Sequence, residues 1–167
     1  MGVALTLQRY LDDHGIDYDV MTHKKTGSSS GTADASHIPS DRLAKGVVVK
    51  RKKGYLLVIL PTSRLLDLKE LAGWLKQPVE LATEEELSAL FPDCDTGAVP
   101  PIGAAYGLRA VVDESLERQE DIYFEGGDHR TLVHLSGTEF HRLMEKIPHE
   151  RFSTQAKRRV TAPQYMV

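Results

Sequence analysis

The chain has 167 residues, which is enough for one domain with its own hydrophobic core. Hydrophobic residues make up 41% and charged residues 27% of it, the balance of an ordinary globular protein. No apolar run approaches the length that spans a bilayer, so we expect no membrane segment. The formal net charge of −3 argues against a general nucleic-acid coat, although a local basic patch could still bind a few phosphates.

Two features of the sequence indicate the compartment. The first five residues lack the basic and apolar regions of a secretory signal. The single cysteine, Cys94, cannot form an internal disulfide, which favours a reducing environment. We therefore expect a cytoplasmic protein.

Three short runs could supply a local basic patch: residues 24–25, 50–53 and 157–159. Runs of this kind can also be solvated turns or frayed ends, and each run taken alone fits that plainer interpretation better. The sequence leaves both interpretations open.

The N-terminal part of the chain begins with a helical pattern. Apolar residues recur at helical spacing over residues 3–14, and Gly15 follows as a stop signal. Residues 18–21 are typical of a short strand. Residues 26–31 predict a flexible loop, and a short helix is expected over residues 33–37.

The clearest strand signal is a hairpin. Two β-rich runs, residues 46–49 and 55–60, flank a charged turn that contains glycine. The second run barely alternates, which predicts a strand buried on both faces. A helix is expected over residues 67–75. Further strands are predicted at residues 79–82, 109–112, 122–124 and 131–135.

Two later helices begin at capping signals. Thr83 and Glu86 have the spacing of a capping box, in which each side chain bonds the other residue's amide, and the helix they start ends near Phe91. Ser136 and Glu139 have the same spacing and predict a second capping box.

Helices and strands are interspersed without a regular βαβ repeat, and the hairpins indicate mixed or antiparallel pairing. The predicted fold class is therefore α+β, with a central mixed, largely antiparallel sheet flanked by helices. We expect one domain over residues 1–147 and a weakly ordered basic C-terminal tail over residues 148–167.

Three segments break the local rules and are candidates for function. The first is Lys45, which precedes three valines of the hairpin's first strand. In a cleft beside the sheet, its ammonium would be a preorganised positive charge for a carbonyl or phosphate oxygen. On spacing alone, a lysine that ends the strand in water is the better interpretation.

The second segment is the loop Gly97-Ala98-Val99-Pro100-Pro101-Ile102-Gly103. Its glycines let the backbone approach a ligand closely, and its prolines stiffen it. Such a loop can serve as an oxyanion hole or hold a terminal ribose. It can equally be a rigid connection between a helix and a strand.

The third segment is the turn Glu125-Gly126-Gly127-Asp128-His129. Its glycines could simply supply the positive φ angles of a hairpin. His129 could orient a substrate, but the pattern fits an exposed turn residue better.

Other chemistries find little support. Cys94 lies between Asp93 and Asp95, and negative neighbours raise the pKa of a thiol, which argues against a nucleophilic cysteine. The seven histidines match no standard metal motif, so no metal site is predicted. No phosphate-binding loop, dinucleotide fingerprint or nucleophile elbow is present, and no cofactor is expected.

Several segments stand in a characteristic order, and their order is more specific than any one of them. They are Leu43-Ala44-Lys45-Gly46-Val47-Val48-Val49, residues 58–61, residues 66–68, Gly97-x-Val99-x-Pro101-x-Gly103, residues 112–116 and residues 127–130. Together they resemble the prolyl-tRNA editing-domain superfamily of trans-acting aminoacyl-tRNA deacylases, the YbaK-like proteins. The resemblance spans about residues 3–147. Gly46 and Gly126 depart from the commoner family residues.

The resemblance implies a cleft in a mixed sheet, a lysine needed for activity, and hydrolysis without a metal or a covalent intermediate. It assigns catalytic roles to Lys45 and Gly97. It assigns substrate contacts to Ala98, Val99, Pro100, Pro101, Ile102, Gly103, Gly127 and His129. The implied partner is the acceptor end of an aminoacyl-tRNA.

We therefore expect an enzyme that hydrolyses the ester of a mischarged aminoacyl-tRNA. In our hypothesis water attacks the ester directly, loop amides stabilise the oxyanion, and Lys45 positions the substrate. A loop carbonyl or the neighbouring ribose hydroxyl could orient the water, with His129 a weaker choice of base. Alanine, serine, threonine and cysteine all remain open as the amino acid.

Two alternatives stay open from the sequence. A non-catalytic module could use the same cleft to bind aminoacyl-RNA ends or aminoacyl adenylates. A hydrolase could act on another small ester or amide. The oligomeric state cannot be read from the sequence.

Overall fold

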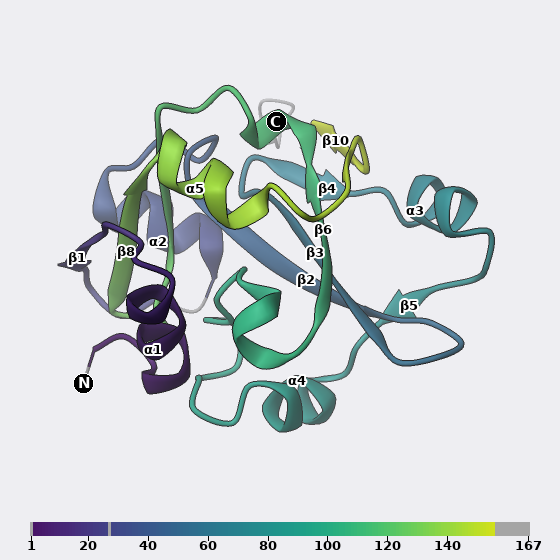
Figure 1. Cartoon of the computed structure of the whole chain (residues 1–167), viewed down its shortest axis with the longest axis horizontal. Helices are drawn as coiled ribbons and strands as arrows, with labels where there is room; N and C mark the ends of the chain where they lie inside the picture. The colour runs from purple at the N-terminus through teal and green to yellow at the C-terminus, as the bar shows by residue number, and fades with distance from the viewer. Residues whose placement is uncertain (1, 27, 156–167) are drawn as a thin grey trace, which may run out of the picture.

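A computed structural model describes residues 2–26 and 28–155 (Figure 1). In chain order, the elements are α1 (Leu5–Asp13), β1 (Asp19–Thr22), α2 (Ser29–Ser36), β2 (Ala44–Lys50), β3 (Tyr55–Pro61), β4 (Arg64–Leu66), α3 (Leu68–Leu75), β5 (Glu80–Leu81), α4 (Glu84–Leu90), the 3₁₀ turn η1 (Gly103–Tyr106), β6 (Arg109–Asp113), the 3₁₀ turn η2 (Glu114–Leu116), β7 (Asp121–Glu125), β8 (Thr131–Ser136), α5 (Gly137–Met144), β9 (His149–Glu150) and β10 (Ser153–Gln155). Within these ranges no helix has both the length and the apolar character to cross a membrane.

The central sheet is mixed, as the sequence predicts. Its strand order is β5-β2-β3-β6-β9, with β2 antiparallel to β3 and β5, and β6 parallel to β3 and β9. A second, antiparallel sheet has the order β1-β8-β7. A parallel bridge between Leu43 and Tyr123 joins the start of β2 to β7. The α+β prediction with a central mixed sheet flanked by helices is confirmed (Figure 1). Two of the four pairings in the central sheet are parallel, so antiparallel pairing predominates only when the smaller sheets are included.

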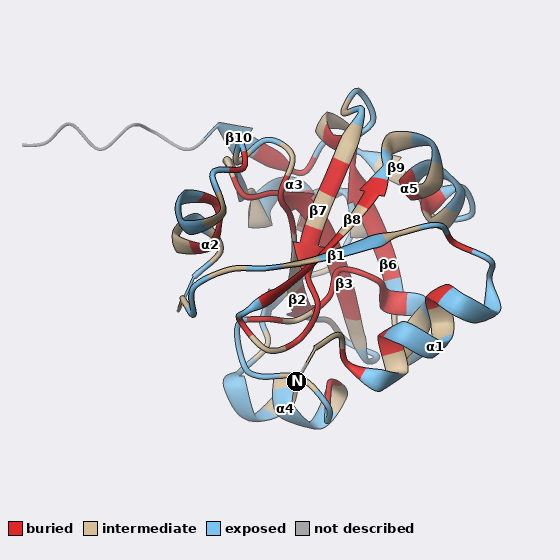
Figure 2. Cartoon of the chain, turned by 90° about the vertical axis from the view of Figure 1, so that its left-hand side faces the viewer, coloured by how far each residue is buried: buried red, intermediate tan, exposed pale blue. Residues whose placement is uncertain are grey.

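The hairpin strand β3 is buried on both faces, which explains its continuous apolar run. Leu57 and Ile59 face the larger part of the core, which includes Leu7 and Leu11 of α1. The alternate residues face a smaller cluster with α3 and Phe152. Figure 2 shows buried residues concentrated along the strands, while α1 and α4 carry exposed outer faces. The sheet therefore provides a rigid platform for whatever its edges carry.

The two capping predictions have different outcomes. The Thr83 hydroxyl accepts from the Glu86 amide at 3.2 Å and Glu86 Oε1 accepts from the Thr83 amide at 3.0 Å, so this capping box is confirmed. The Ser136 hydroxyl caps α5 by accepting from the Glu139 amide. The Glu139 carboxylate accepts instead from Arg142 at 2.6 Å, so the second capping box is only half right.

Two of the expected element boundaries are corrected. The segment expected as a loop over residues 26–31 already contains the start of α2, because the Ser28 hydroxyl accepts from the Gly31 amide at 3.0 Å and caps a helix that begins at Ser29. The segment expected as a tail from residue 148 forms β9 and β10 in its first part. Phe152 between them is buried because it fills the smaller core cluster. Residues 157–159 lie outside the described residues.

Candidate active site

Lys45 lies beside a small cavity at the edge of the central sheet. Strand β2 pairs with β3 along its length but with β5 only at Val49 and Lys50, so on that side its first residues are not covered by β5. The cavity there has a volume of about 70 Å³. It is lined by Ser29, Leu43, Ala44, Lys45, Gly46, Leu87, Gly97, Val99 and Glu125. The lysine and the start of the glycine loop thus share one cavity.

The Lys45 ammonium is placed to meet an anionic or carbonyl oxygen. Burial lowers the pKa of the Lys45 side chain from its ordinary value, because an ammonium loses hydration there. Over residues 2–26 and 28–155, no carboxylate lies within 4.0 Å of this ammonium. A half-buried positive charge without a protein counter-ion is costly for stability and is typical of a functional site.

Gly97 and Val99 also line this cavity. Gly97 is exposed and has φ +86°, a backbone conformation that glycine adopts easily. In the described part of the chain, the amides of Gly97 and Val99 find no acceptor, whereas the Ala98 amide donates to the Asp95 carbonyl at 3.1 Å. Two unused N–H donors beside an ammonium can stabilise negative charge on a substrate oxygen.

The rest of the glycine loop turns away from this cavity. Ala98, Pro100, Pro101 and Ile102 are buried. A Cβ at Gly103 would lie 2.9 Å from the Leu108 carbonyl oxygen, so this glycine is needed for packing. Ile102 and Gly103 line a separate apolar cavity. Of the predicted loop contacts, the structure brings only Gly97 and Val99 to Lys45.

The turn over residues 125–129 holds the start of the loop. The Gly127 carbonyl accepts from the Asp95 amide at 2.7 Å. His129 Nε2 donates to the Thr96 carbonyl at 2.7 Å, since a carbonyl can only accept. His129 is buried rather than exposed, and neither it nor Gly127 lines the Lys45 cavity. Both predicted contact residues therefore act on the loop just before Gly97.

Glu125 is a cavity residue that the sequence reasoning missed. Its side chain is only 7% exposed, and its Oε2 accepts from the Thr32 hydroxyl at 2.7 Å. His23 Nε2 lies 3.2 Å from Oε1, and His129 Nδ1 lies 3.9 Å from Oε2. A carboxylate directly before two glycines at the end of a buried strand was the one available signal. Thr32 and His23 gave none, because α2 and the residue that follows β1 come close to Glu125 only in the folded chain.

Cys94 does not provide a nucleophile. Burial raises the pKa of its thiol to about 12, and the neighbouring Asp93 and Asp95 add to the rise. Its Sγ lies 3.3 Å from the Tyr106 hydroxyl, packed under the loop. This agrees with the prediction from its acidic flanks.

Comparisons with known families, sequences and structures find proteins that are similar to this chain. The family model described as aminoacyl-tRNA editing domain matches residues 23–143. Proteins named multifunctional Ser/Thr-tRNA deacylase ProXp-y, from Escherichia coli strains K12 and O157:H7, are each 29% identical over 143 residues, covering 81% of this chain and 84% of theirs. A crystal structure of a candidate trans-editing enzyme for prolyl-tRNA synthetase has a TM-score of 0.79 at 25% identity, covering 90% of this chain and 96% of that one.

Proposed function

We propose that this chain, which belongs to the aminoacyl-tRNA editing domain family, removes an amino acid from transfer RNA by hydrolysing the ester to the terminal ribose. One observation carries the assignment of the site. Lys45 lines the same cavity as Gly97 and Val99, two residues whose amides have no acceptor among residues 2–26 and 28–155. That arrangement suits the ester of a small amino acid, with the amino acid in the cavity and the ribose and its phosphate at the cavity's mouth.

The reaction needs a water molecule and no covalent intermediate. Water adds to the ester carbonyl carbon, the carbon–oxygen bond to the ribose breaks, and the proton ends on the ribose oxygen. The products are the free amino acid and a transfer RNA with a free terminal hydroxyl. The amides of Gly97 and Val99 stabilise the oxyanion as it forms, a contribution that in other enzymes amounts to about 10²–10³ in rate for one donor.

Lys45 positions the substrate. Its ammonium, which has no counter-ion among the residues that the structure describes, binds the terminal phosphate or the ester carbonyl oxygen and so fixes the ester against the loop. The water is oriented by a loop carbonyl or by the neighbouring ribose hydroxyl. His129 is not the base in this proposal, because it does not line the Lys45 cavity and instead supports the loop through its Nε2 hydrogen bond to the Thr96 carbonyl.

The cavity selects a small amino acid with a hydroxyl group. Its volume of about 70 Å³ is less than half of the roughly 150 Å³ that accommodates a benzene ring in a protein interior, so aromatic side chains do not fit. Ser29 and Glu125 line it with groups that can accept a hydrogen bond from a substrate hydroxyl, and the Glu125 carboxylate also attracts the α-ammonium. We therefore propose serine or threonine among the four amino acids left open by the sequence.

A panel of mischarged transfer RNAs tests the proposal. Seryl and threonyl esters should be deacylated, alanyl and cysteinyl esters more slowly, and phenylalanyl esters at the uncatalysed rate. Lys45→Ala should lose roughly 10²-fold or more in single-turnover rate. Lys69→Ala, which removes an exposed lysine from α3, is the matched control and should keep the wild-type rate.

Three results would contradict the proposal in different ways. A Lys45→Ala rate equal to that of Lys69→Ala would remove Lys45 from the mechanism. Binding of acylated RNA without turnover of any ester would make the protein a binding module. Turnover of minimal amino-acid esters that RNA attachment does not improve would indicate a hydrolase of other small molecules.

A further inference from the structure

A second cavity, larger and strongly cationic, lies at the turn of the β2–β3 hairpin. Its volume is about 490 Å³. The residues that line it are Arg51, Lys52, Lys53, Gln77 and Arg109. Four of these side chains are positive and the fifth is a neutral amide. The chain has a formal net charge of −3, so this hollow is a positively charged region on a negatively charged protein.

The four cations are not engaged by the protein's own carboxylates. Across the described ranges, none of them lies within 4.0 Å of an aspartate or glutamate oxygen, whereas the adjacent Lys50 pairs with Glu86 at 3.1 Å. In the same part of the chain, the Nε of Arg51 is buried and has no hydrogen-bond acceptor. A buried donor without an acceptor is unfavourable, so this guanidinium is held beside the hollow at a cost to stability and without an anionic partner among the described residues.

The hairpin turn is fixed, so these charges are held together before any ligand arrives. The Lys52 amide donates to Gln77 Oε1 at 3.0 Å, which ties the turn to the segment after α3. The Arg51 amide donates to the Gly54 carbonyl at 3.0 Å. The turn therefore presents its cations from a preorganised backbone, which reduces the entropy lost on binding.

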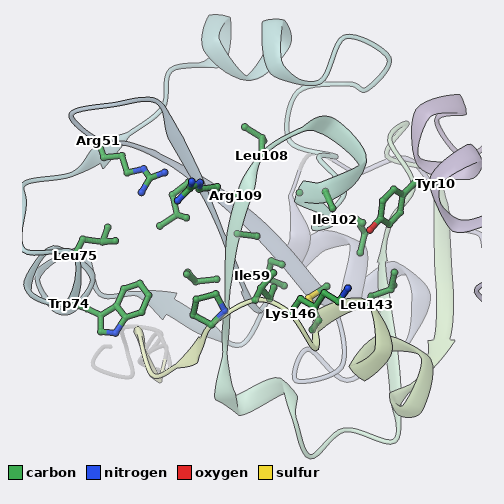
Figure 3. Close-up of a pocket in the computed structure, with 18 residues that line it drawn as sticks. Tyr10, Arg51, Ile59, Trp74, Leu75, Ile102, Leu108, Arg109, Leu143 and Lys146 are labelled. Carbon is green, nitrogen blue, oxygen red and sulfur yellow. The ribbon is translucent and has the colours of Figure 1, made fainter. Parts of the chain in front are cut away.

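An aromatic side chain lies next to the cationic hollow. Arg51 and Arg109 also line the adjoining apolar cavity, together with Trp74 (Figure 3). Trp74 is 41% exposed although its ring packs edge-on against Phe152. Guanidinium groups and an accessible indole along one cavity are a combination that binds single-stranded nucleic acid, through phosphates and base stacking.

The hollow is also at a useful distance from the candidate active site. Strand β2 runs from the Lys45 cavity to the hairpin turn, where Arg51 directly follows the last strand residue, Lys50. Six residues of strand span about 20 Å, the length of about six stacked nucleotides. An RNA end whose ester lies at Lys45 would therefore bring its backbone to Arg51 within a few nucleotides.

We propose that the hollow lined by Arg51, Lys52, Lys53 and Arg109 binds backbone phosphates of the substrate RNA, several nucleotides before the acylated end. The identity of the ligand, the substrate RNA, rests on the proposed function. The patch acts in binding and takes no part in ester cleavage, so its contribution appears with RNA substrates only. It also explains how a protein with net negative charge holds a polyanion.

The test compares two substrates and two charge-matched double variants. Lys52→Ala/Lys53→Ala removes two cations from the hollow, and Arg9→Ala/Arg118→Ala removes two exposed arginines elsewhere. On aminoacyl-tRNA, the first variant should lose roughly tenfold in kcat/KM at low salt, and its slope of log kcat/KM against log salt should flatten by about two. On an aminoacyl-adenosine, which has no phosphate backbone, both variants should match the wild type.

Each other outcome overturns the proposal. An equal loss on both substrates would mean that the lysines support the fold, and an equal loss in both double variants would mean that only the overall charge matters. No loss with RNA would mean that the hollow is a solvated turn. If the wild type deacylates neither substrate, the proposed function fails, and binding of an uncharged acceptor-stem hairpin RNA then tests the patch alone: affinity equal in the wild type and in Lys52→Ala/Lys53→Ala would rule it out.

Discussion

The imidazole of His129 packs directly behind Gly97. A Cβ added to Gly97 would lie 3.2 Å from His129 Cε1 and 3.4 Å from Nε2, while that same Nε2 donates to the Thr96 carbonyl. The turn that ends β7 therefore sets the conformation of the loop that faces Lys45. Two segments about 30 residues apart in the sequence form one wall of the cavity.

Gly97→Ala should lower deacylation by tenfold or more, because the substitution adds backbone strain of about 1–2 kcal/mol and pushes the loop from the imidazole. Gly107→Ala is the matched control. Gly107 also has a positive φ, +69°, but a Cβ there would meet nothing within 4 Å. Thermal melts should show a similar loss of stability in both variants. Single-turnover rates should show a loss of rate only in Gly97→Ala. Equal rates would mean that the loop conformation is irrelevant to catalysis.

His129→Ala should lower kcat as a positioning change. Removal of the imidazole leaves the Thr96 carbonyl without its donor and lets the loop relax, so kcat should fall at every pH while the shape of the pH profile is kept. His129→Asn, which tolerates the φ of +59° found here, separates the backbone effect from loss of the imidazole. If the wild type loses rate at acid pH and His129→Ala does not, the imidazole is a base after all.

The fold was largely predictable because its signals are local. The apolar run of β3, the glycine in the hairpin turn and the Thr83 capping box each act within a few residues. The start of α2 was not predictable, because serine and glycine are weak helix formers. That helix is held by Thr32, whose hydroxyl bonds Glu125 far along the chain. Tertiary contact overrides propensity there.

The site was only partly predictable for the same reason. Lys45 and Gly97 follow from the resemblance to a family, but their neighbours depend on pairing that no short pattern records. Glu125 reaches the cavity because β7 lies beside the start of β2, through the bridge from Leu43 to Tyr123. Ile102 was expected at the substrate, but it is 2% exposed and packs in the larger core cluster, away from the Lys45 cavity.

The pKa of Lys45 predicts an alkaline limb in the pH profile of deacylation. Because burial lowers that pKa below its ordinary 10.5, the ammonium loses its proton at a lower pH than an exposed lysine, and activity that needs the charge should fall there. The measurement is enzymatic rate after subtraction of spontaneous ester hydrolysis. If Lys45→Arg is active, its limb should vanish, since a guanidinium stays charged. If the alkaline limb is unchanged in Lys45→Arg, the group that titrates there is not Lys45.

The same pKa has a consequence for stability. A folded-state pKa below the unfolded value means that the charged ammonium opposes folding at neutral pH, and this opposition fades as the pH rises through the lowered pKa. Lys45→Met should therefore keep or raise Tm at pH 7 while abolishing activity. A lowered Tm would show that the ammonium has a stabilising partner.

Cys94→Ala should keep deacylase activity within about threefold, since the thiol is neither nucleophilic nor at the cavity. The Tyr106 hydroxyl still donates to Asp93 at 2.9 Å in its absence, so the loop keeps its support. With a pKa of about 12, the wild-type thiol should also react slowly with iodoacetamide at pH 8 compared with the unfolded protein. Rapid alkylation with loss of activity would contradict both points.

Phe152→Ala tests whether the domain extends past residue 147. Phe152 is 1% exposed and fills the smaller core cluster, and its amide donates to the buried Asp113 carboxylate at 2.8 Å. Its truncation should cost about 3–5 kcal/mol in the free energy of unfolding, measured in urea with an unchanged m-value. Leu65→Ala on the adjoining β4 is the control, because Leu65 is 54% exposed and should cost less than about 0.5 kcal/mol. Equal costs would mean that residues 148–155 are a dispensable tail, as their composition first indicated.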